Sequence, residues 1–375
     1  MAPMNRVLGL SLAALLAVGV LVAIVGSYVL GHHAPAASLV TVRGVIGSEK
    51  QPYFQDPDVI KVFHDHGYDV QVDVAGSRQI ATTVDLSKYD FAFPAGVPQA
   101  NKIKADHKAK ATYSPFYTPM AIATFKPIVD LLMQPGVGVV TNQGGAYLFD
   151  VSAYLKLVAV NKRWTDLPNA TTLYPAGKSI LITSTDVRTS NSAAMYLALA
   201  SYVANGDNVV QDPQQAQTVL PIVSPLFLRQ GLTETSSEVP FNDYLSIGIG
   251  KSPMVMIYEA QYVAKETAKD GSLTAQNVLM YPSPTVLSKH TLVPLTPHGD
   301  AIGQLLLNDA QLQKLAVKYG FRTSDPTAFK NYLDSKQVPQ PPQLINVIEP
   351  PAYDPLEAMI SGIESEMNLL KTQGG

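Results

Sequence analysis

The chain has 375 residues, of which 46% are hydrophobic and 15% charged, with a formal net charge of −3. Such a chain can bury two compact cores, so we expect two lobes and exclude intrinsic disorder. Acidic and basic residues are interleaved throughout, without the basic face typical of nucleic-acid binding. The absence of Cys excludes disulfides, thiolate metal sites, cysteine catalysis and a lipidated N-terminal cysteine.

An apolar segment without charged residues occupies positions 7–30. As a helix rising 1.5 Å per residue, it would span the roughly 30 Å hydrocarbon layer of a membrane. Its length favours a retained anchor, and the alternative is an export signal cleaved near Ala34-Pro35-Ala36. Arg6 precedes the segment and the next Lys or Arg is Arg43, so the bulk of the chain is expected outside the cytoplasm. The prediction is a single-pass cell-membrane protein, or a secreted one after cleavage.

From residue 39 onward, strand and helix patterns alternate. A strand at 39–46 ends in Gly47-Ser48, a helix covers 58–66, and a strand at 68–74 leads to Gly76-Ser77. Ligands bind at the carboxyl ends of strands in open α/β sheets, so Ser48 and Ser77 are candidate ligand contacts. The alternatives are a plain turn serine at Ser48 and a helix-capping serine at Ser77.

The rest of the chain continues the same alternation. Further strands are expected at 89–93, 120–125, 136–141, 180–182, 254–257 and 290–295. Further helices are expected at 101–109, 152–164, 193–203, 212–227, 242–249, 300–307, 309–319, 326–333 and 355–370. The last helix carries one apolar stripe, through which we expect it to pack on the first lobe: Leu356, Met359, Ile360 and Ile363.

The stretch 179–205 combines a short apolar run, a polar loop and a helix. Ser190, Asn191 and Ser192 are residues of the N-cap type at the start of this helix, where free N–H groups and the positive end of the helix dipole favour an anion or a carbonyl-rich ligand. The alternative is an ordinary capped helix. Further on, Tyr258 can donate its phenol to a ligand or fill the interface between lobes.

Sequence motifs for catalysis or nucleotide binding are lacking. Two Gly-Lys-Ser tripeptides, at 177–179 and 250–252, have no upstream glycine at the spacing of a P-loop. No G-x-S-x-G elbow, H-E-x-x-H motif or His-rich ligand cluster occurs. Because a Ser-His-Asp triad need not be local in sequence, a hydrolase remains the weakest of the alternatives.

Six blocks together resemble the type II periplasmic solute-binding proteins: GSEK, GSRQIATTVDLSKYDFAFPAG, SPFYTPMAIATF, TSTDVRTSNSAAMYLALASYVAN, SPMVMIYEAQYV and YPSPTVLSKHTLVPL. More narrowly, they resemble the branch with molybdate and sulfate binders, in a membrane-anchored actinobacterial form. The resemblance spans 39–360. It implies an α/β fold with two lobes joined by two crossover segments: lobe 1 at 39–118 plus 285–375 and lobe 2 at 119–284, preceded by an anchor and tether at 1–38.

The resemblance implies that a small polar solute, and specifically an oxyanion, binds between the lobes, outside the cytoplasm, as cargo of an ABC-type uptake system. It implies no enzyme activity, cofactor or metal, and a permease or envelope protein as partner besides the membrane at 7–30. Ser48, Ser77 and the residues from Ser190 to Ser192 would hold the oxyanion, with Arg78, Tyr258 and Glu259 completing the predicted site. Asp186 and Glu259 add negative charge there unless Arg188 or Arg78 neutralises it. A membrane-tethered solute sensor or envelope interaction module is the alternative.

Overall fold

The computed structural model describes residues 38–231, 234–339, 343 and 346–373. The predicted anchor at 7–30 and the cleavage site near Pro35 lie outside these residues. Among the helices that the structure describes, none is both long and apolar enough to cross a bilayer.

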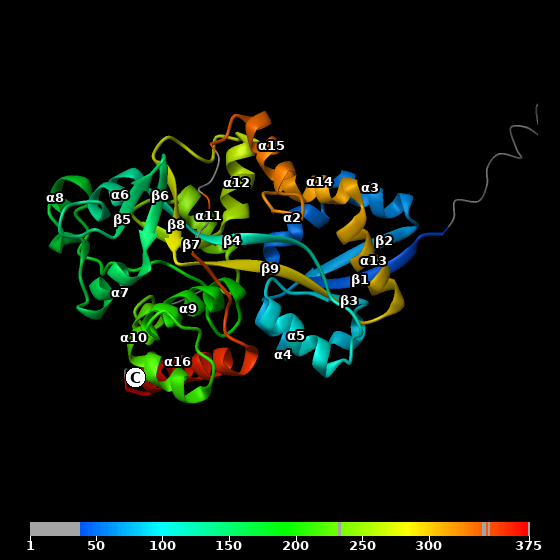
Figure 1. Cartoon of the computed structure of the whole chain (residues 1–375), viewed down its shortest axis with the longest axis horizontal. Coiled ribbons are helices and arrows are strands. Elements are labelled where there is room, and N and C mark those ends of the chain that lie inside the picture. Colours follow the sequence, from blue (N-terminus) through cyan, green and yellow to red (C-terminus); the bar gives the residue numbers. More distant parts are fainter. Residues whose placement is uncertain (1–37, 232–233, 340–342, 344–345, 374–375) are drawn as a thin grey trace, which may run out of the picture.

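A single sheet runs through the molecule, with strand order β2-β1-β3-β9-β4-β8-β6-β5, while β7 pairs with β4 and β10 with β9 (Figure 1). Its strands are β1 (Val40–Ile46), β2 (Tyr68–Val74), β3 (Phe91–Phe93), β4 (Tyr113–Phe125), β5 (Val140–Gln143), β6 (Ala146–Asp150), β7 (Met254–Tyr258), β8 (Asn277–Ser283), β9 (Thr285–Pro294) and β10 (Val347–Ile348). The fold is mixed α/β, as expected.

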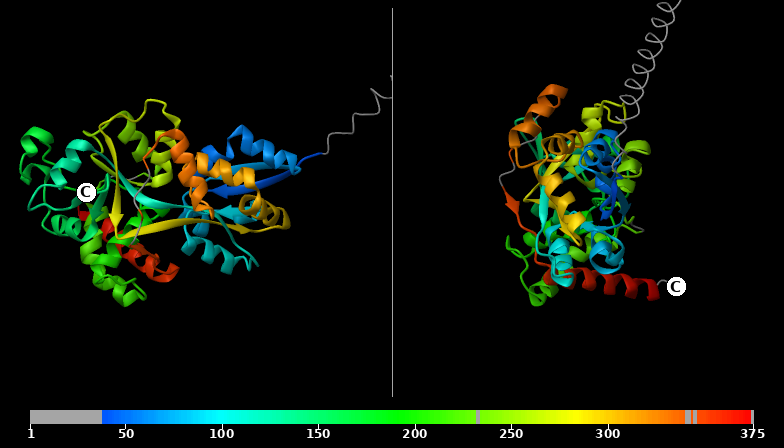
Figure 2. Two further views of the ribbon diagram at one scale, coloured as in Figure 1. Left: turned by 45° about the horizontal axis from the view of Figure 1, so that its top comes forward. Right: turned by 90° about the vertical axis from the view of Figure 1, so that its right-hand side faces the viewer.

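Helices cover the sheet on both faces (Figures 1 and 2). In the first part of the chain they are η1 (Ser48–Lys50), α2 (Gln51–Phe54), α3 (Pro57–Asp65), α4 (Ser77–Thr82), η2 (Leu86–Lys88), α5 (Val97–Asp106), α6 (Lys126–Leu132), α7 (Val151–Ala159), η3 (Trp164–Asp166) and α8 (Ala170–Leu173). They continue as α9 (Asn191–Ala204), α10 (Pro213–Leu228), α11 (Glu238–Ser246), α12 (Glu259–Ala268), α13 (Pro297–Asn308), α14 (Ala310–Lys318), α15 (Pro326–Lys336) and α16 (Tyr353–Gln373).

The first lobe is built around β1, β2 and β3, which are parallel. Successive side chains of a strand point to opposite faces of the sheet. Val42 and Ile46 of β1 therefore join a core with α3, α13 and α14, whereas Val45 joins a second core with α4 and α5. The carboxyl-terminal half of β1 is therefore buried on both faces of the sheet, whereas its first residues are exposed.

The second lobe contains β5 to β8 and the helices α6 to α11. Its core includes α9, which is buried along the segment from Asn191 to Ser201. The apolar run 180–182, expected as a strand, forms no ladder: only single bridges flank it, between Arg163 and Ser179 and between Thr183 and Val255. Ile180 and Ile182 are still buried, because a short apolar run packs into a core without needing strand partners.

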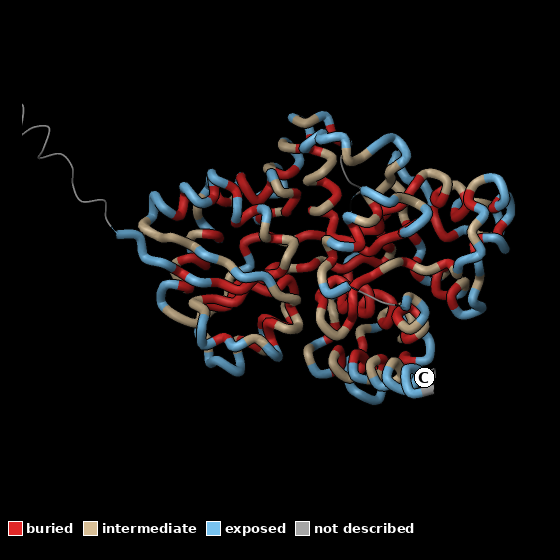
Figure 3. The backbone as a smooth tube through the Cα atoms, turned by 180° about the vertical axis from the view of Figure 1, so that it is seen from behind, coloured by how far each residue is buried: buried red, intermediate tan, exposed pale blue. Residues whose placement is uncertain are grey.

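Two long strands, β4 and β9, connect the lobes and pair with each other antiparallel from Tyr113 to Pro119 of β4 (Figure 1). Beyond this ladder β4 pairs with β7 and β8 of the second lobe, while β9 pairs with β3 of the first. Both strands therefore belong partly to each lobe. The buried residues follow the strands and inner helix faces on both sides of this connection (Figure 3). The exact lobe boundaries remain a prediction.

The final helix differs in part from the expectation, because α16 packs mainly beside α10 of the second lobe and makes a smaller contact with α5 of the first (Figures 1 and 2). Leu356, Met359, Ile360 and Ile363 lie in the same core as α9 and α10. A Cβ on Gly362 would lie 2.4 Å from Leu220 Cδ1, so this glycine lets the two helices approach closely. The apolar stripe of α16 correctly predicted that this face of the helix is buried. It did not predict that α10 is the main helix against which it packs.

Candidate functional site

A small polar cavity of about 140 Å³, which we call the serine cavity, lies where both lobes meet. Its walls come from the carboxyl ends of strands and the starts of helices: Gly47, Ser48, Glu49, Val74, Ala75, Gly76, Ser77, Gln79, Ser190, Asn191, Thr235, Ser236, Ser237 and Tyr258. Serines that are distant in the sequence therefore line one space. This is the convergence expected for the carboxyl ends of strands in an open α/β sheet.

Each predicted serine is placed by the start of a helix. Ser48 begins η1 directly after β1, and Ser190 is the N-cap residue of α9. Ser77 is the first residue of α4, whose N-cap is Gly76, so the expectation that Ser77 caps this helix is wrong. Its hydroxyl instead accepts a hydrogen bond from the Ala95 N–H at 2.9 Å. Since an acceptor hydroxyl keeps its own proton free, Ser77 can still donate to a ligand.

Other hydroxyl groups that line the serine cavity are hydrogen-bonded to neighbouring hydroxyl groups. Ser48 Oγ lies 2.8 Å from Ser236 Oγ, and Ser190 Oγ lies 3.0 Å from Ser192 Oγ. The Tyr258 hydroxyl accepts a hydrogen bond from Asn191 Nδ2 at 3.1 Å, which leaves its proton available. Asn191 Oδ1 is buried and has no hydrogen-bond partner among the described residues. The cavity thus presents several polar groups with unused hydrogen-bonding capacity.

Five of the eight predicted ligand residues line the serine cavity: Ser48, Ser77, Ser190, Asn191 and Tyr258. The other three do not. Ser192 is buried behind Ser190 and pairs with Thr185. Arg78 donates to both carboxylate oxygens of Glu357 and to the Arg188 carbonyl.

Glu259, the third exception, is fully buried and bound by Arg322, whose Nε and Nη2 lie 2.8 and 2.7 Å from its carboxylate oxygens. Asp186 is paired with Arg188, as the sequence suggested. Both acids are therefore neutralised, although Arg322 takes the role expected of Arg78. No local pattern marks Arg322 as the partner of Glu259, since 63 positions separate the two residues.

Sequence reasoning missed several residues of the cavity wall, namely Glu49, Gln79 and the segment from Thr235 to Ser237. Ser237 is the N-cap residue of α11, which begins at Glu238 and not near Asn242 as expected. The run Thr235-Ser236-Ser237 directly before an acidic residue is the usual sign of a helix start, and it could have revealed this wall.

A buried ionic cluster of Glu49, Lys50 and His290 lies behind the serine cavity. Lys50 is fully buried, with Nζ 2.5 Å from Glu49 Oε1 and 3.1 Å from His290 Nδ1. Burial and the charge of Lys50 lower the pKa of His290 to about 4, so the imidazole is neutral near pH 7. Although burial opposes ionisation, Lys50 and His290 hold the pKa of Glu49 well below its usual range. Burial lowers the pKa of Lys50, and the Glu49 carboxylate opposes this shift. As an ion pair, Glu49 and Lys50 offset each other's charge.

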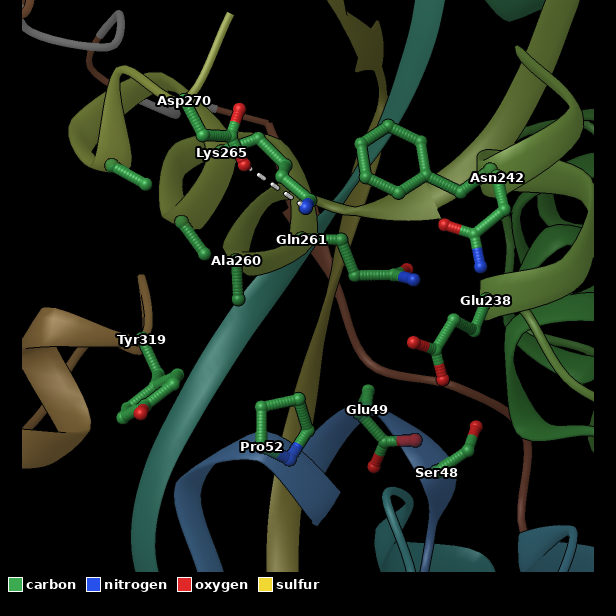
Figure 4. Close-up of a pocket in the computed structure, with 13 residues that line it drawn as sticks. Ser48, Glu49, Pro52, Glu238, Asn242, Ala260, Gln261, Lys265, Asp270 and Tyr319 are labelled. Carbon is green, nitrogen blue, oxygen red and sulfur yellow. Dashed lines mark hydrogen bonds and ion pairs between the residues drawn. The ribbon is translucent and has the colours of Figure 1, made fainter. Parts of the chain in front are cut away.

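A second cavity, of about 260 Å³, adjoins the serine cavity and shares Ser48 and Glu49 with it (Figure 4). We call it the side cavity. It is lined mainly from η1 and α2 of the first lobe and from α11 and α12: Ser48, Glu49, Pro52, Glu238, Phe241, Asn242, Ala260, Gln261, Ala264, Lys265, Ala268, Asp270 and Tyr319. The cleft therefore has a polar end and a larger, more apolar end.

Two other predicted features lie away from this cleft. The two Gly-Lys-Ser turns meet each other, since Lys178 Nζ donates to the Gly250 carbonyl at 2.8 Å. Trp164 is fully buried and contacts Tyr174. Within the described part of the chain no cluster of His, Asp or Glu could hold a metal ion.

No family model and no curated protein matches the sequence. The fold resembles the sulfate-binding protein SubI from Mycobacterium tuberculosis H37Rv, with a TM-score of 0.53, 17% identity, and coverage of 84% of this chain and 95% of that one. It also resembles the agropinic-acid-binding AgtB of A. tumefacien R10, with a TM-score of 0.51, 11% identity, and coverage of 89% and 98%. A third neighbour is the apo ferric ion-binding protein A of Pasteurella haemolytica, with a TM-score of 0.50, 12% identity, and coverage of 88% and 97%.

These neighbours are solute-binding proteins, so the chain has the mixed α/β fold of the periplasmic binding proteins. The α/β class expected from the sequence is thereby confirmed, whereas the predicted transmembrane helix lies outside the described residues. Because the neighbours are named for three chemically different ligands, the fold by itself does not select a ligand for this chain.

Proposed function

We propose that the protein binds a small polar solute through an oxyanion group held in the serine cavity, as the extracytoplasmic substrate-binding component of an ABC-type uptake system. The observation that carries this proposal is the meeting of Ser48, Ser77 and Ser190 in one cavity at the junction of the lobes. The sulfate-binding neighbour supports it by showing that an oxyanion binder can have this fold.

Neutral groups suffice to hold an anion at this position. The first N–H groups of α9 have no partners within their own helix, whereas in α11 the Glu238 and Val239 N–H groups already donate to Ser236. The dipoles of both helices add partial positive charge at their N-terminal ends. Ser190 and Ser237, the N-cap residues of these two helices, both line the cavity. Backbone N–H and hydroxyl donors can therefore surround the oxyanion without a full countercharge.

A closed cleft is consistent with reversible capture. Ser48 and Ser77 come from the first lobe, whereas Ser190 and Ser236 come from the second. The paired strands β4 and β9 are the connection at which the lobes would hinge. A ligand touching both lobes stabilises the closed state because it has contacts there that the open state lacks.

The test is a thermal-shift and calorimetric titration with sulfate, molybdate, tungstate and phosphate, using chloride at equal ionic strength as control. A ligand at 100 times its Kd should stabilise the fold by about 2.7 kcal/mol. The double variant Ser48→Ala/Ser190→Ala should lose most of this gain, since a hydrogen bond to a charged ligand contributes about 1.5–3 kcal/mol. Ser365→Ala, an exposed serine of α16, is the matched control. An undiminished shift in the double variant would refute the assigned site.

A membrane-tethered sensor or envelope module would use the same cavity without transport. Uptake measurements in cells separate the two roles, because only the transport role predicts loss of solute uptake when the protein is deleted.

A further inference from the structure

We propose that the ligand is not a bare inorganic oxyanion but an organic anion that also carries an amine. Its acidic group would occupy the serine cavity, and its amine-bearing body would extend into the side cavity (Figure 4). This inference rests on the proposed function, because it takes the serine cavity as the seat of the acidic group.

The two cavities adjoin, since Ser48 and Glu49 line both, and we take them together as one candidate site. The side cavity, about 260 Å³, is the larger of the two, the serine cavity being about 140 Å³. Together they fall within the roughly 300–1,000 Å³ usual for pockets that bind organic molecules. A tetrahedral inorganic anion would use only the smaller part.

The walls of the side cavity suit a short hydrocarbon segment. Pro52 of the first lobe and Ala260 of α12 line this cavity (Figure 4). Phe241 of α11 and Ala264 of α12 add further apolar surface to the same cavity. Burying methylene groups against such side chains contributes roughly 0.8 kcal/mol for each CH₂. A fully hydrated inorganic anion gains nothing from these apolar surfaces.

The charges of the side cavity favour a cation. Among the ionised groups that line it, Glu49 is offset by Lys50 and Asp270 is paired with Lys265 at 3.3 Å. Glu238 also lines it, and among the described residues its carboxylate has no ion pair or hydrogen bond. Figure 4 shows this carboxylate directed towards the same space as the Glu49 carboxylate and the Ser48 hydroxyl. Glu238 is therefore the group that an amine of the ligand would approach.

Polar amides surround this carboxylate. The side chains of Asn242 and Gln261 project into the same space from α11 and α12 (Figure 4). Gln261 already accepts from the Tyr258 N–H through Oε1 at 3.1 Å. Asn242 supplies a carbonyl oxygen that accepts a hydrogen bond from an ammonium group. An amine beside Glu238 would thus have both a countercharge and an acceptor.

The experiment compares ligands that share an acidic group and differ only in the amine. Calorimetry on the full chain would use 2-aminoethanesulfonate against ethanesulfonate, and 2-aminoethyl phosphate against ethyl phosphate, with sulfate and phosphate as inorganic references. We expect each amine-bearing ligand to bind at least tenfold more tightly than its amine-free partner. The variant Glu238→Gln should abolish this difference in affinity, and Glu349→Gln, at an exposed ion pair, should leave the difference intact.

The outcomes distinguish this inference from the proposed function. If inorganic or amine-free anions bind the wild-type protein as tightly as the amine-bearing ones, the inference that the ligand carries an amine is overturned. The proposal that the serine cavity binds an oxyanion is unaffected by that result. If the amine preference survives in Glu238→Gln, the inference is likewise wrong. If no anion of any kind binds, the proposed function itself fails. Measurements on the wild-type protein alone show whether amine-free anions bind as tightly as amine-bearing ones, and whether any anion binds. The test therefore works even if Glu238→Gln does not fold.

Discussion

Ser48 Oγ and Ser236 Oγ lie 2.8 Å apart, although 188 positions separate the two residues in the sequence. Ser48 belongs to the first lobe and Ser236 to the loop before α11 in the second. Their contact therefore joins the lobes across the cleft. It lies at the boundary between the serine cavity and the side cavity, since Ser48 lines both.

A close backbone approach at Gly76 also holds the lobes together. A Cβ added at Gly76 would lie 2.3 Å from the Thr189 carbonyl oxygen. This separation is too short for two non-bonded atoms, so the backbone at Gly76 or Thr189 would have to move. Because Gly76 and Thr189 belong to different lobes, Gly76→Ala should force the cleft open. We expect anion affinity to fall at least tenfold, a loss of about 1.4 kcal/mol, with a larger radius of gyration in X-ray scattering. Gly177→Ala, at a glycine with open space around it, should change neither quantity. Unaltered binding by Gly76→Ala would mean that the closed arrangement is not needed.

Removal of Lys50 should strongly destabilise the protein. Lys50→Met leaves the Glu49 carboxylate buried without its cation, and breaking a buried pair in this way costs about 3–5 kcal/mol. Urea denaturation measures the change in the free energy of unfolding. Lys61→Met, which removes an exposed ion pair of α3, should cost less than about 1 kcal/mol. Equal effects of the two substitutions would contradict the role of the buried cluster.

The buried His290 predicts a specific dependence of stability on pH. Burial and the Lys50 charge lower the pKa of His290 from 6.5 to about 4. Between these values the unfolded chain binds a proton that the folded protein does not, so stability falls as the pH decreases from 6.5 to 4 and is fully present above 6.5. The loss attributable to this residue is roughly 3 kcal/mol. In denaturation curves measured across this range, the free energy of unfolding of His290→Gln should depend less on pH than that of the wild type. The exposed His107→Gln should show the same dependence as the wild type.

Arg78 should act on stability more than on ligand affinity. Its Nε lies 2.8 and 3.0 Å from the two carboxylate oxygens of Glu357, which links α4 to the C-terminal helix α16. Arg78→Lys loses the bidentate geometry, so we expect the free energy of unfolding to fall by about 1–3 kcal/mol. Anion affinity should change less than tenfold, because Arg78 does not line the serine cavity. Arg43→Lys, at an exposed pair with Asp73, is the control. A larger loss of affinity than of stability would place Arg78 in the ligand site after all.

The site could be predicted from the sequence only where local signals mark the end of a strand or the start of a helix. Ser48, Ser77 and Ser190 were identifiable because each follows a turn or precedes a helical repeat, and all three line the serine cavity. Ser192 carries the same local signal as Ser190. It nevertheless lies behind the cavity, because helical geometry turns it towards Thr185. Residue spacing alone did not distinguish these two orientations.

The sequence by itself determined the α/β alternation and the apolar faces of the elements, because burial imposes periods of 2.0 and 3.6 residues that remain legible in a single chain. Only the tertiary structure decided which distant groups meet: Arg322 with Glu259, Lys50 with His290, and α16 with α10. Such partners are chosen by the path of the chain through space. An ionic or apolar side chain specifies that it needs a partner, but not where in the sequence that partner lies.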